Sequence, residues 1–432
     1  MRSPIGRSLV ALAVMTTMVT VAGCAVTQPP PDTAQLSRAP SVTFTQRGID
    51  SVGDASAVVV DGTRRLGVAL ARSDGSQRRS PNTLVAPFSA MTALEAVRAG
   101  ADGATADEID SAVGPYRPAA VAALLGQLAV IAGDPGTTDA GNPPPVPLYH
   151  QATGLFLADS TPPRTPYLDE LSRWFDTGVY PMRFATDQSE RALDEWATVN
   201  TAGQQTRAPI STDRSTSLAV AATAFLAASW AEPFLPSDTG DAAFTTDSGR
   251  VTQVPTMQAD IPARVARAGR WTALEVPFAG ADLALQIILP ADRAGADTVL
   301  DDEVLGEVAT TLRRTPTTGD VAVSLPRWTT NATVDVRRAL TGLGVRAPFS
   351  GGLDAIGRGT VVSSLGQSGA LTIAERGTAG FADAQTTSPS SVAPTPAAGK
   401  RFTADRPFVY QVVDTSTSLP VFIGLMGDPS VS

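Results

Sequence analysis

The chain has 432 residues, 43% hydrophobic residues, 17% charged residues and a formal net charge of −9. This composition predicts a folded body with a sizeable core, and the lack of a basic block argues against nucleic-acid binding, which needs a positive face. A single Cys (Cys24) and a single His (His150) exclude a disulfide within the chain and a zinc site built from Cys and His.

The N-terminus is predicted to be a targeting segment. Arg2 and Arg7 precede a short apolar run over residues 9–21, which suits a cleaved signal peptide better than a membrane span of about 20 residues. Val21-Ala22-Gly23-Cys24 resembles a bacterial lipobox, which implies that Cys24 becomes the lipidated first residue of the mature protein. An ordinary secretory signal with an incidental Cys, or an uncleaved anchor, is the alternative.

We therefore expect a signal peptide over residues 1–23, a Pro-rich tether over 24–41 and a folded body over 42–432. Apolar periodicity predicts the elements of the body in chain order. Helices are expected over residues 57–71, from 87 to 100, from 103, and over 119–132, 167–175, 190–201, 302–314 and 334–342. Strands are expected at 82–86 and over 151–158, 180–184, 217–230, 264–266, 271–277, 283–289, 321–326 and 361–374, followed by an apolar run from 402.

Local signals refine this picture. Ser89 is available to cap the helix that begins near Pro87, and Thr105 with Glu108 has the spacing of a capping box for the next helix. Residues 217–230 are almost wholly apolar, which predicts a strand buried on both faces in the middle of a large sheet. Helices come first and strands follow with few crossover units, which favours a single α+β domain with large mixed sheets.

A long segment dense in Ser, Pro and Thr, residues 388–400, separates the strand ending at Ala374 from the apolar run at Phe402. Loops of this length within a compact domain tend to be functional or disordered. His150 lies at the edge of another Pro-rich loop and is interpreted as an ordinary surface or structural side chain. Because no Gly-x-Ser-x-Gly elbow accompanies it, hydrolase activity is not expected.

Several segments, taken in this order, are similar to the serpin family. Asn82 to Ser89 resembles the family's Asn-x-x-x-Ser-Pro-x-Ser, with Ala86 in place of its first Ser. The other matching segments are 100–109, 196–203, 225–234, 254–257, 275–278 and 287–290. The most specific is Phe402 to Val412, where Asp405, Pro407 and Phe408 fit the family's C-terminal Asn/Asp-x-Pro-Phe pattern.

The resemblance implies a single serpin-like α+β domain, with about nine helices around three β-sheets and an exposed reactive-centre loop at about 375–401. It implies a protease inhibitor that acts as a suicide substrate and not an enzyme. The target protease cleaves the loop and stays bound to it as an acyl complex, and the cut loop inserts into the central sheet as a new strand. No cofactor or metal is expected, although residue types alone leave a carboxylate-only magnesium or calcium site open.

Insertion requires small side chains at every second position of the loop hinge, because alternate side chains of a central strand face the core. The expected hinge residues are Glu375, Gly377, Thr378, Gly380, Ala382 and Ala384. Those at every second position from Thr378 are small, as burial requires. Phe381 and Asp383 depart from the family's preference for small residues. They fall on the other face of the inserted strand, where a large or charged side chain costs less free energy than in the core.

The resemblance also implies a polar group beneath the sheet where it opens, and a Trp at the loop entry. Ser89 occupies the Ser of that group, Gln367 replaces its His and Ala222 replaces its Asn, so half of the network is missing. Gln367 is expected to reach Ser89. The resemblance places Trp230 at the loop entry. The alternative is an ordinary packed core Trp, and the two interpretations are compatible.

The usual loop length places the scissile bond at Ser391-Val392, with neighbouring bonds as alternatives. Because no Arg or Lys lies between Arg376 and Lys400, the target is expected to be a serine protease that prefers small residues, such as an elastase- or subtilisin-like enzyme. The competing hypothesis is a non-inhibitory serpin-fold surface lipoprotein that binds a ligand or partner, and a disordered insert without function is the alternative for residues 388–399.

The expected partners are a target protease and, through a lipid on Cys24, the membrane, with no nucleic acid. The expected location is extracellular, on a bacterial cell surface, and the protein is expected to be monomeric.

Overall fold

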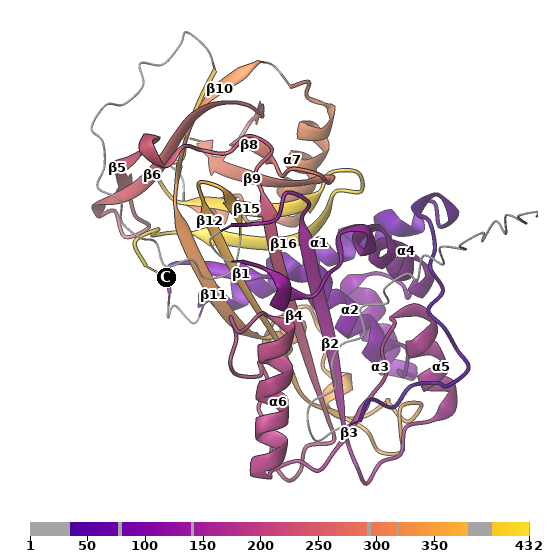
Figure 1. Cartoon of the computed structure of the whole chain (residues 1–432). Coiled ribbons are helices and arrows are strands. Elements are labelled where there is room, and N and C mark those ends of the chain that lie inside the picture. Colours follow the sequence, from indigo (N-terminus) through magenta and orange to yellow (C-terminus); the bar gives the residue numbers. More distant parts are fainter. Residues whose placement is uncertain are drawn as a thin grey trace, which may run out of the picture.

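Three β-sheets and eight α-helices make up the part of the chain that the computed structural model describes (Figure 1). That part comprises residues 35–76, 80–139, 142–291, 295–317, 319–378 and 400–431. The α+β class, the single domain and the three sheets are confirmed, and eight α-helices stand in these residues where about nine were expected. The helices are α1 (Ala55–Ser76), α2 (Pro87–Arg98), α3 (Gly103–Val113), α4 (Pro118–Leu128), α5 (Thr165–Trp174), α6 (Asp187–Asn200), α7 (Asp302–Arg314) and α8 (Val336–Gly342).

One six-stranded sheet, sheet A, has the strand order β11-β12-β13-β4-β2-β3. Its strands are β11 (Trp328–Asp335), β12 (Val362–Ala374), β13 (Gly377–Thr378), β4 (Leu218–Ser229), β2 (Leu148–Ala158) and β3 (Tyr180–Met182). β4 lies inside the sheet, and eleven of its twelve residues are buried. The prediction of a central strand buried on both faces is therefore confirmed.

The other two sheets complete the upper part of the molecule in Figure 1. Sheet B has the order β1-β16-β15-β9-β8-β7 and sheet C the order β14-β10-β6-β5. The strands of sheet B are β1 (Thr83–Val85), β16 (Leu419–Met426), β15 (Phe408–Asp414), β9 (Leu283–Pro290), β8 (Trp271–Pro277) and β7 (Arg264–Ala268). Those of sheet C are β14 (Lys400–Thr403), β10 (Asp320–Pro326), β6 (Val251–Pro262) and β5 (Thr239–Thr245).

The two faces of sheet A are covered differently. Helix α6 lies across one face (Figure 1), where Trp196 packs edge-on against Phe156 with ring centroids 5.6 Å apart. The other face belongs to the main core, where Ala222 and Ala224 of β4 pack in one cluster with Phe88 of α2. Side chains at even positions of β4 therefore face α2, and those at odd positions face α6.

Two side-chain predictions at helix ends are wrong. Ser89 does not cap α2; its hydroxyl donates to the carbonyl of Thr223, 2.8 Å away. Thr105 and Glu108 form no capping box, because Thr105 donates to the carbonyl of Gly351 and Glu108 accepts from the amides of Arg346 and Ala347. In each case the helix is packed closely enough on another segment for a tertiary acceptor or donor to replace the local one.

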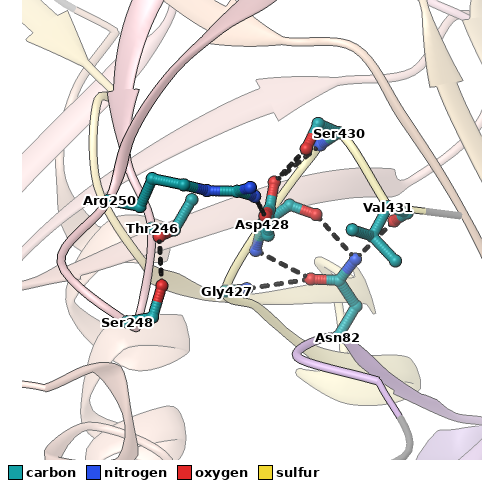
Figure 2. Close-up of polar contacts among 8 residues, drawn as sticks. All are labelled: Asn82, Thr246, Ser248, Arg250, Gly427, Asp428, Ser430 and Val431. Atoms are coloured by element: carbon teal, nitrogen blue, oxygen red, sulfur yellow. Dashed lines mark hydrogen bonds and ion pairs between the residues drawn. The ribbon is translucent and has the colours of Figure 1, made fainter.

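The C-terminus is fastened to the start of β1 (Figure 2). The Asn82 side chain donates to the carbonyls of Asp428 and Val431 and accepts from the amides of Gly427 and Asp428, at 2.7 to 3.0 Å. Arg250 forms an ion pair with Asp428 at 2.9 Å. All four hydrogen-bonding positions of the buried amide are thus satisfied, which gives Asn82 a clear structural role.

Candidate functional site

The seam between β4 and β12 is the feature that sets sheet A apart. The two strands run parallel and pair from Val362 opposite Leu218 to Gly369 opposite Ala224. At the upper end β13 stands between them, antiparallel to both, with Thr378 opposite Ile373 on β12 and Ala228 on β4. Between these points, residues 225–227 and 370–372 have no strand on their facing edges within the described chain.

Gly377 and Thr378 are shaped for this position. Gly377 has φ +146°, and an added Cβ would lie 1.9 Å from the carbonyl oxygen of Ala228, so only glycine allows the approach. Thr378 is fully buried on the core-facing side, which is the side that the alternation of the hinge assigns to it. Its hydroxyl has no hydrogen-bond partner among the described residues.

The turn before β13 is tied down on two sides. The Glu375 carboxylate accepts a 2.9 Å hydrogen bond from the Thr239 hydroxyl and forms a 3.3 Å ion pair with Arg327. The backbone carbonyl of Glu375 accepts from the amide of Phe234, and the Arg376 side chain donates to Asn142. These contacts hold the last described residues of the hinge against β5 and the end of β10.

Trp230 lies directly beneath this turn. Its indole Nε1 donates to the carbonyl of Ala374 at 2.8 Å, and its backbone amide donates to Arg376. The ring is fully buried and stacks on Phe278, with centroids 4.6 Å apart. The residue is a packed core Trp in contact with the loop entry, so both interpretations offered for it describe its position.

Ser89, Ala222 and Gln367 come together beneath the seam, but the expected bond between Ser89 and Gln367 is not formed. Ala222 and Gln367 are direct cross-strand neighbours. Gln367 accepts a 3.2 Å hydrogen bond from the amide of Ala86, while Ser89 bonds to Thr223. The start of α2 offers the free amide of Ala86, so each side chain ties α2 to a different strand of the seam, and Gln367 Nε2 is left without a partner among the described residues.

The family-type motif near the C-terminus has a packing role. The Asp405 carbonyl accepts from the amide of Thr245, and Pro407 precedes the first residue of β15. Phe408 is fully buried against Trp328, with ring centroids 5.4 Å apart. The motif therefore joins sheet B to the neighbouring sheets.

His150 is structural and not a surface residue. It is buried on β2, and its Nε2 lies 2.9 Å from the amide oxygen of Asn200 on α6. Burial lowers its pKa, against the opposing effect of the hydrogen bond with Asn200. This contact secures α6 on sheet A.

Several predicted site residues lie outside the described residues: Cys24, Gly380, Ala382, Ala384, Ser391 and Val392. Arg327, Thr239 and Phe278 belong to the hinge anchorage and were not predicted from the sequence. Phe278 ends the family-like segment 275–278, which gave it no role in the hinge, and no local pattern marks Arg327 or Thr239, because these contacts arise where three sheets meet. Among the described residues no cluster of three or more His, Cys, Asp or Glu could hold a metal ion, and no helix is long and apolar enough to cross a membrane.

Comparison with known proteins decides the family. The family model "Serpin (serine protease inhibitor)" matches residues 61–429. The chain belongs to the serpin family. Serpin-ZXA of Oryza sativa is 27% identical over 369 residues, covering 81% of this chain and 90% of that protein. The human protein Z-dependent protease inhibitor is 23% identical, covering 85% of this serpin and 82% of its relative.

Solved structures agree on the fold. The native state of the thermophilic serpin tengpin superposes with a TM-score of 0.71 at 17% identity, covering 91% of this chain and 99% of tengpin. Thyroxine-binding globulin in complex with thyroxine gives a TM-score of 0.68 at 18% identity, covering 86% and 99%. Family members are in general protease inhibitors and not enzymes, and their partner is a target protease.

Proposed function

We propose that this serpin inhibits a protease as a suicide substrate, by inserting its cleaved loop between β4 and β12. The observation that carries the proposal is β13, which already stands between these strands and is antiparallel to both. A strand that continued from Thr378 in the same direction would run down the seam. It would offer backbone hydrogen bonds to both flanks, each with a net value of about 0.5–1.5 kcal/mol.

The chemistry would be supplied by the protease. Its nucleophile attacks the carbonyl carbon of the scissile bond, the new amino terminus departs with a proton, and an ester or thioester joins the protease to the loop. Insertion then carries the protease away from the loop entry before water can cleave that bond. We place the scissile bond at Ser391-Val392, with a serine protease that prefers small residues as the target.

The location of the protein is a further part of the proposal. We infer a monomer on a bacterial cell surface, held by a lipid on Cys24. Ser37 exchanges two backbone hydrogen bonds with Val179, next to β3, so the N-terminal segment joins sheet A at the end opposite β13. Nine residues of β4 separate the register positions of the two ends, about 30 Å at about 3.3 Å per residue. A membrane anchor would thus leave the loop facing away from the membrane.

A non-inhibitory binding module is the second candidate. The orphaned Gln367 Nε2 and the departures at Phe381 and Asp383 favour it, since each marks a place where the usual opening machinery is altered. Thyroxine-binding globulin shows that the same fold can hold a small ligand.

Incubation with elastase, subtilisin and chymotrypsin separates the two candidates. The inhibitor predicts an SDS-resistant adduct with the combined mass of the protease and the chain cut within residues 388–395. Protease whose active-site Ser has been blocked beforehand is the control and should give no adduct. Clean cleavage of the loop with full recovery of protease activity would contradict inhibition of that protease class.

A further inference from the structure

His150 lies where three parts of the fold meet. It is on β2, and Phe225 of β4 is its cross-strand neighbour. The C-terminal end of α6 contacts the ring from above the sheet. Residues 132–134 run beside β2, since Ala132 forms a parallel bridge with Tyr149. His150 is 4% exposed, so a change in its charge acts on a closed interface.

The contact with Asn200 fixes where the single proton of the neutral ring lies. The amide nitrogen of Asn200 donates to the carbonyl of Trp196 at 2.7 Å, so its amide oxygen is the atom that faces His150 Nε2, 2.9 Å away. The reverse orientation would place the amide oxygen against the Trp196 carbonyl, where neither atom can donate. Nε2 therefore carries the proton and donates it to Asn200, and a second proton would bind at Nδ1.

The surroundings of the ring favour this neutral form. The pKa of His150 is lowered, chiefly because burial disfavours the charged ring, while hydrogen bonds with Asn200 and the Gly133 backbone and the charge of Asp134 oppose this effect. A lowered pKa in the folded state means that the unfolded chain binds the second proton more readily. The contribution of His150 to stability is therefore complete above its ordinary pKa of 6.5 and is lost as the pH falls below that value.

Little charge is available to compensate a protonated ring. Neither β2 nor β4 contains a charged residue. Asp134 supplies the charge that acts on the ring, and its carboxylate already accepts a 2.9 Å hydrogen bond from the amide of Gly136. The charged side chains of α6 are exposed except for Asp194, which is half-buried and accepts from the amide of Ala208.

The rest of α6 is attached to sheet A by apolar packing. Ala192, Leu193 and Trp196 belong to the buried cluster beneath the helix, with the Trp196 ring edge-on against Phe156. Loss of the His150 contact would therefore loosen the C-terminal end of α6 and leave its middle packed on the sheet.

We propose that His150 is an acid-sensitive contact that holds the end of α6 and residues 132–134 on sheet A at neutral pH and releases both when the ring takes a second proton. The contact acts in the uncleaved protein and requires no inserted loop. Because the chain contains no other His, a single imidazole would give the protein this response.

A single His also allows the ring to be followed alone by NMR, in protein purified without a histidine tag. With isotope-labelled His, the titration should give an apparent pKa below 6.5 and, at pH 7.5, the nitrogen shifts of the Nε2-protonated tautomer. Asn200→Asp places a carboxylate against Nε2 and should raise the apparent pKa. An ordinary or raised pKa in the wild type, or the Nδ1-protonated tautomer, would overturn the inference, and neither reading depends on a variant that folds.

Amide hydrogen exchange at pH 5.0 and 7.5, corrected for intrinsic rates, tests the release itself. In the wild type, the last turn of α6 should lose protection at pH 5.0, by up to about tenfold for each unit that the measured His150 pKa lies below 6.5, while sheet B keeps its protection. His150→Gln can still donate to Asn200 but takes no proton, so the protection of α6 should be equal at the two pH values.

Glu95→Gln is the matched control, because it removes another buried titrating group, on α2 at the opposite face of sheet A. This variant should keep the wild-type acid response of α6. Equal acid losses of α6 protection in the wild type and in His150→Gln would show that other groups cause the response and that His150 is only a packed side chain.

Discussion

Thr378 is the residue on which the proposed insertion would first depend. It is fully buried between two strands, at the point where the described hinge ends. Its hydroxyl has no hydrogen-bond partner among the described residues. The position therefore accepts a small polar side chain with a loss of stability, and no described group there could pair with a charged one. The side chain at 378 should therefore control whether the loop can start to insert.

Replacement of Thr378 tests this directly. Thr378→Arg should turn the inhibitor into a substrate, because an unpaired buried guanidinium costs several kcal/mol. The number of inhibitor molecules consumed per protease should rise about tenfold or more. Thr378→Val has the same shape without the hydroxyl and should keep the wild-type stoichiometry. Equal stoichiometries for both variants, measured by titration of protease activity, would contradict burial at this position.

Glu95 makes a separate residue-scale prediction about pH. It is buried in α2, and one of its carboxylate oxygens has no partner among the described residues. Its pKa is raised from an ordinary value of 4.5 to about 8, mainly because burial disfavours the charged form; Asp110 contributes to this rise, and Arg98 opposes it. A raised pKa means that the folded state favours the protonated acid, so its contribution to stability is complete below pH 4.5 and is lost as the pH rises towards about 8.

The expected result is a difference between wild type and Glu95→Gln that grows with pH. The Gln variant resembles the protonated acid and should have nearly the wild-type melting temperature at pH 4.5 and a higher one at pH 8.5. Thermal melts of both proteins across this range isolate Glu95 from the other titrating groups. A difference in melting temperature between the two proteins that stays constant across this pH range would contradict a raised pKa of Glu95 in the folded state.

At the scale of elements, one ion pair anchors the β12–β13 turn and joins two sheets. The side chains of Arg327 and Glu375 are 25% and 11% exposed, so the pair is largely shielded from solvent. Glu375 precedes β13 and Arg327 lies between β10 and β11. The pair thus couples the loop hinge in sheet A to sheet C.

Glu375→Gln should lower the stability of the native form by about 1–3 kcal/mol, because it leaves the Arg327 guanidinium short of a charged partner. Arg327→Met should cost a similar amount, and the double variant less than the sum. Arg183→Met is the control, since its pair with Asp159 is exposed by 81% and 45% and should contribute little. Additive losses in denaturant melts would show that the two residues act independently.

Sequence patterns predicted some elements well and missed others for physical reasons. Helix α7 and strand β8 were predicted with their observed bounds, because both have strong periodicity and clear ends. Strand β6 was missed, since its exposed and buried positions alternate irregularly through Val251–Pro262. Strand β11 was missed in front of α8, because few of its residues are apolar and it lies at the edge of sheet A.

The candidate site divides in a similar way. Strands β4 and β12 and the positions of Gly377, Thr378 and Trp230 could be predicted from the chain alone, while the hinge residues beyond Thr378 lie outside the described residues. The ion pair with Arg327 and the bond from Ala86 to Gln367 could not, because they depend on how distant segments meet. Such contacts follow from the fold and leave no periodic trace in the sequence.

At the scale of the whole molecule, β13 fills only the start of a strand position between β4 and β12 in the described chain. The hydrogen bonds of Asn82 hold the C-terminal segment in place, and the hydrogen bond between His150 and Asn200 holds α6 on sheet A. The seam between β4 and β12 is then the one place in the described chain where we infer a large rearrangement. In the proposed mechanism the native form is held by a kinetic barrier, which cleavage of the loop would remove.

Hydrogen exchange of the cleaved protein is a direct test of strand insertion. After cleavage within residues 388–395, amides of residues 379–388 should become protected to the same degree as those of β4, because they would be bonded within the sheet. The uncleaved protein, measured in parallel, gives the reference exchange rate for the same residues. Rapid exchange of residues 379–388 in the cleaved form, with β4 still protected, would contradict insertion and the function proposed from it.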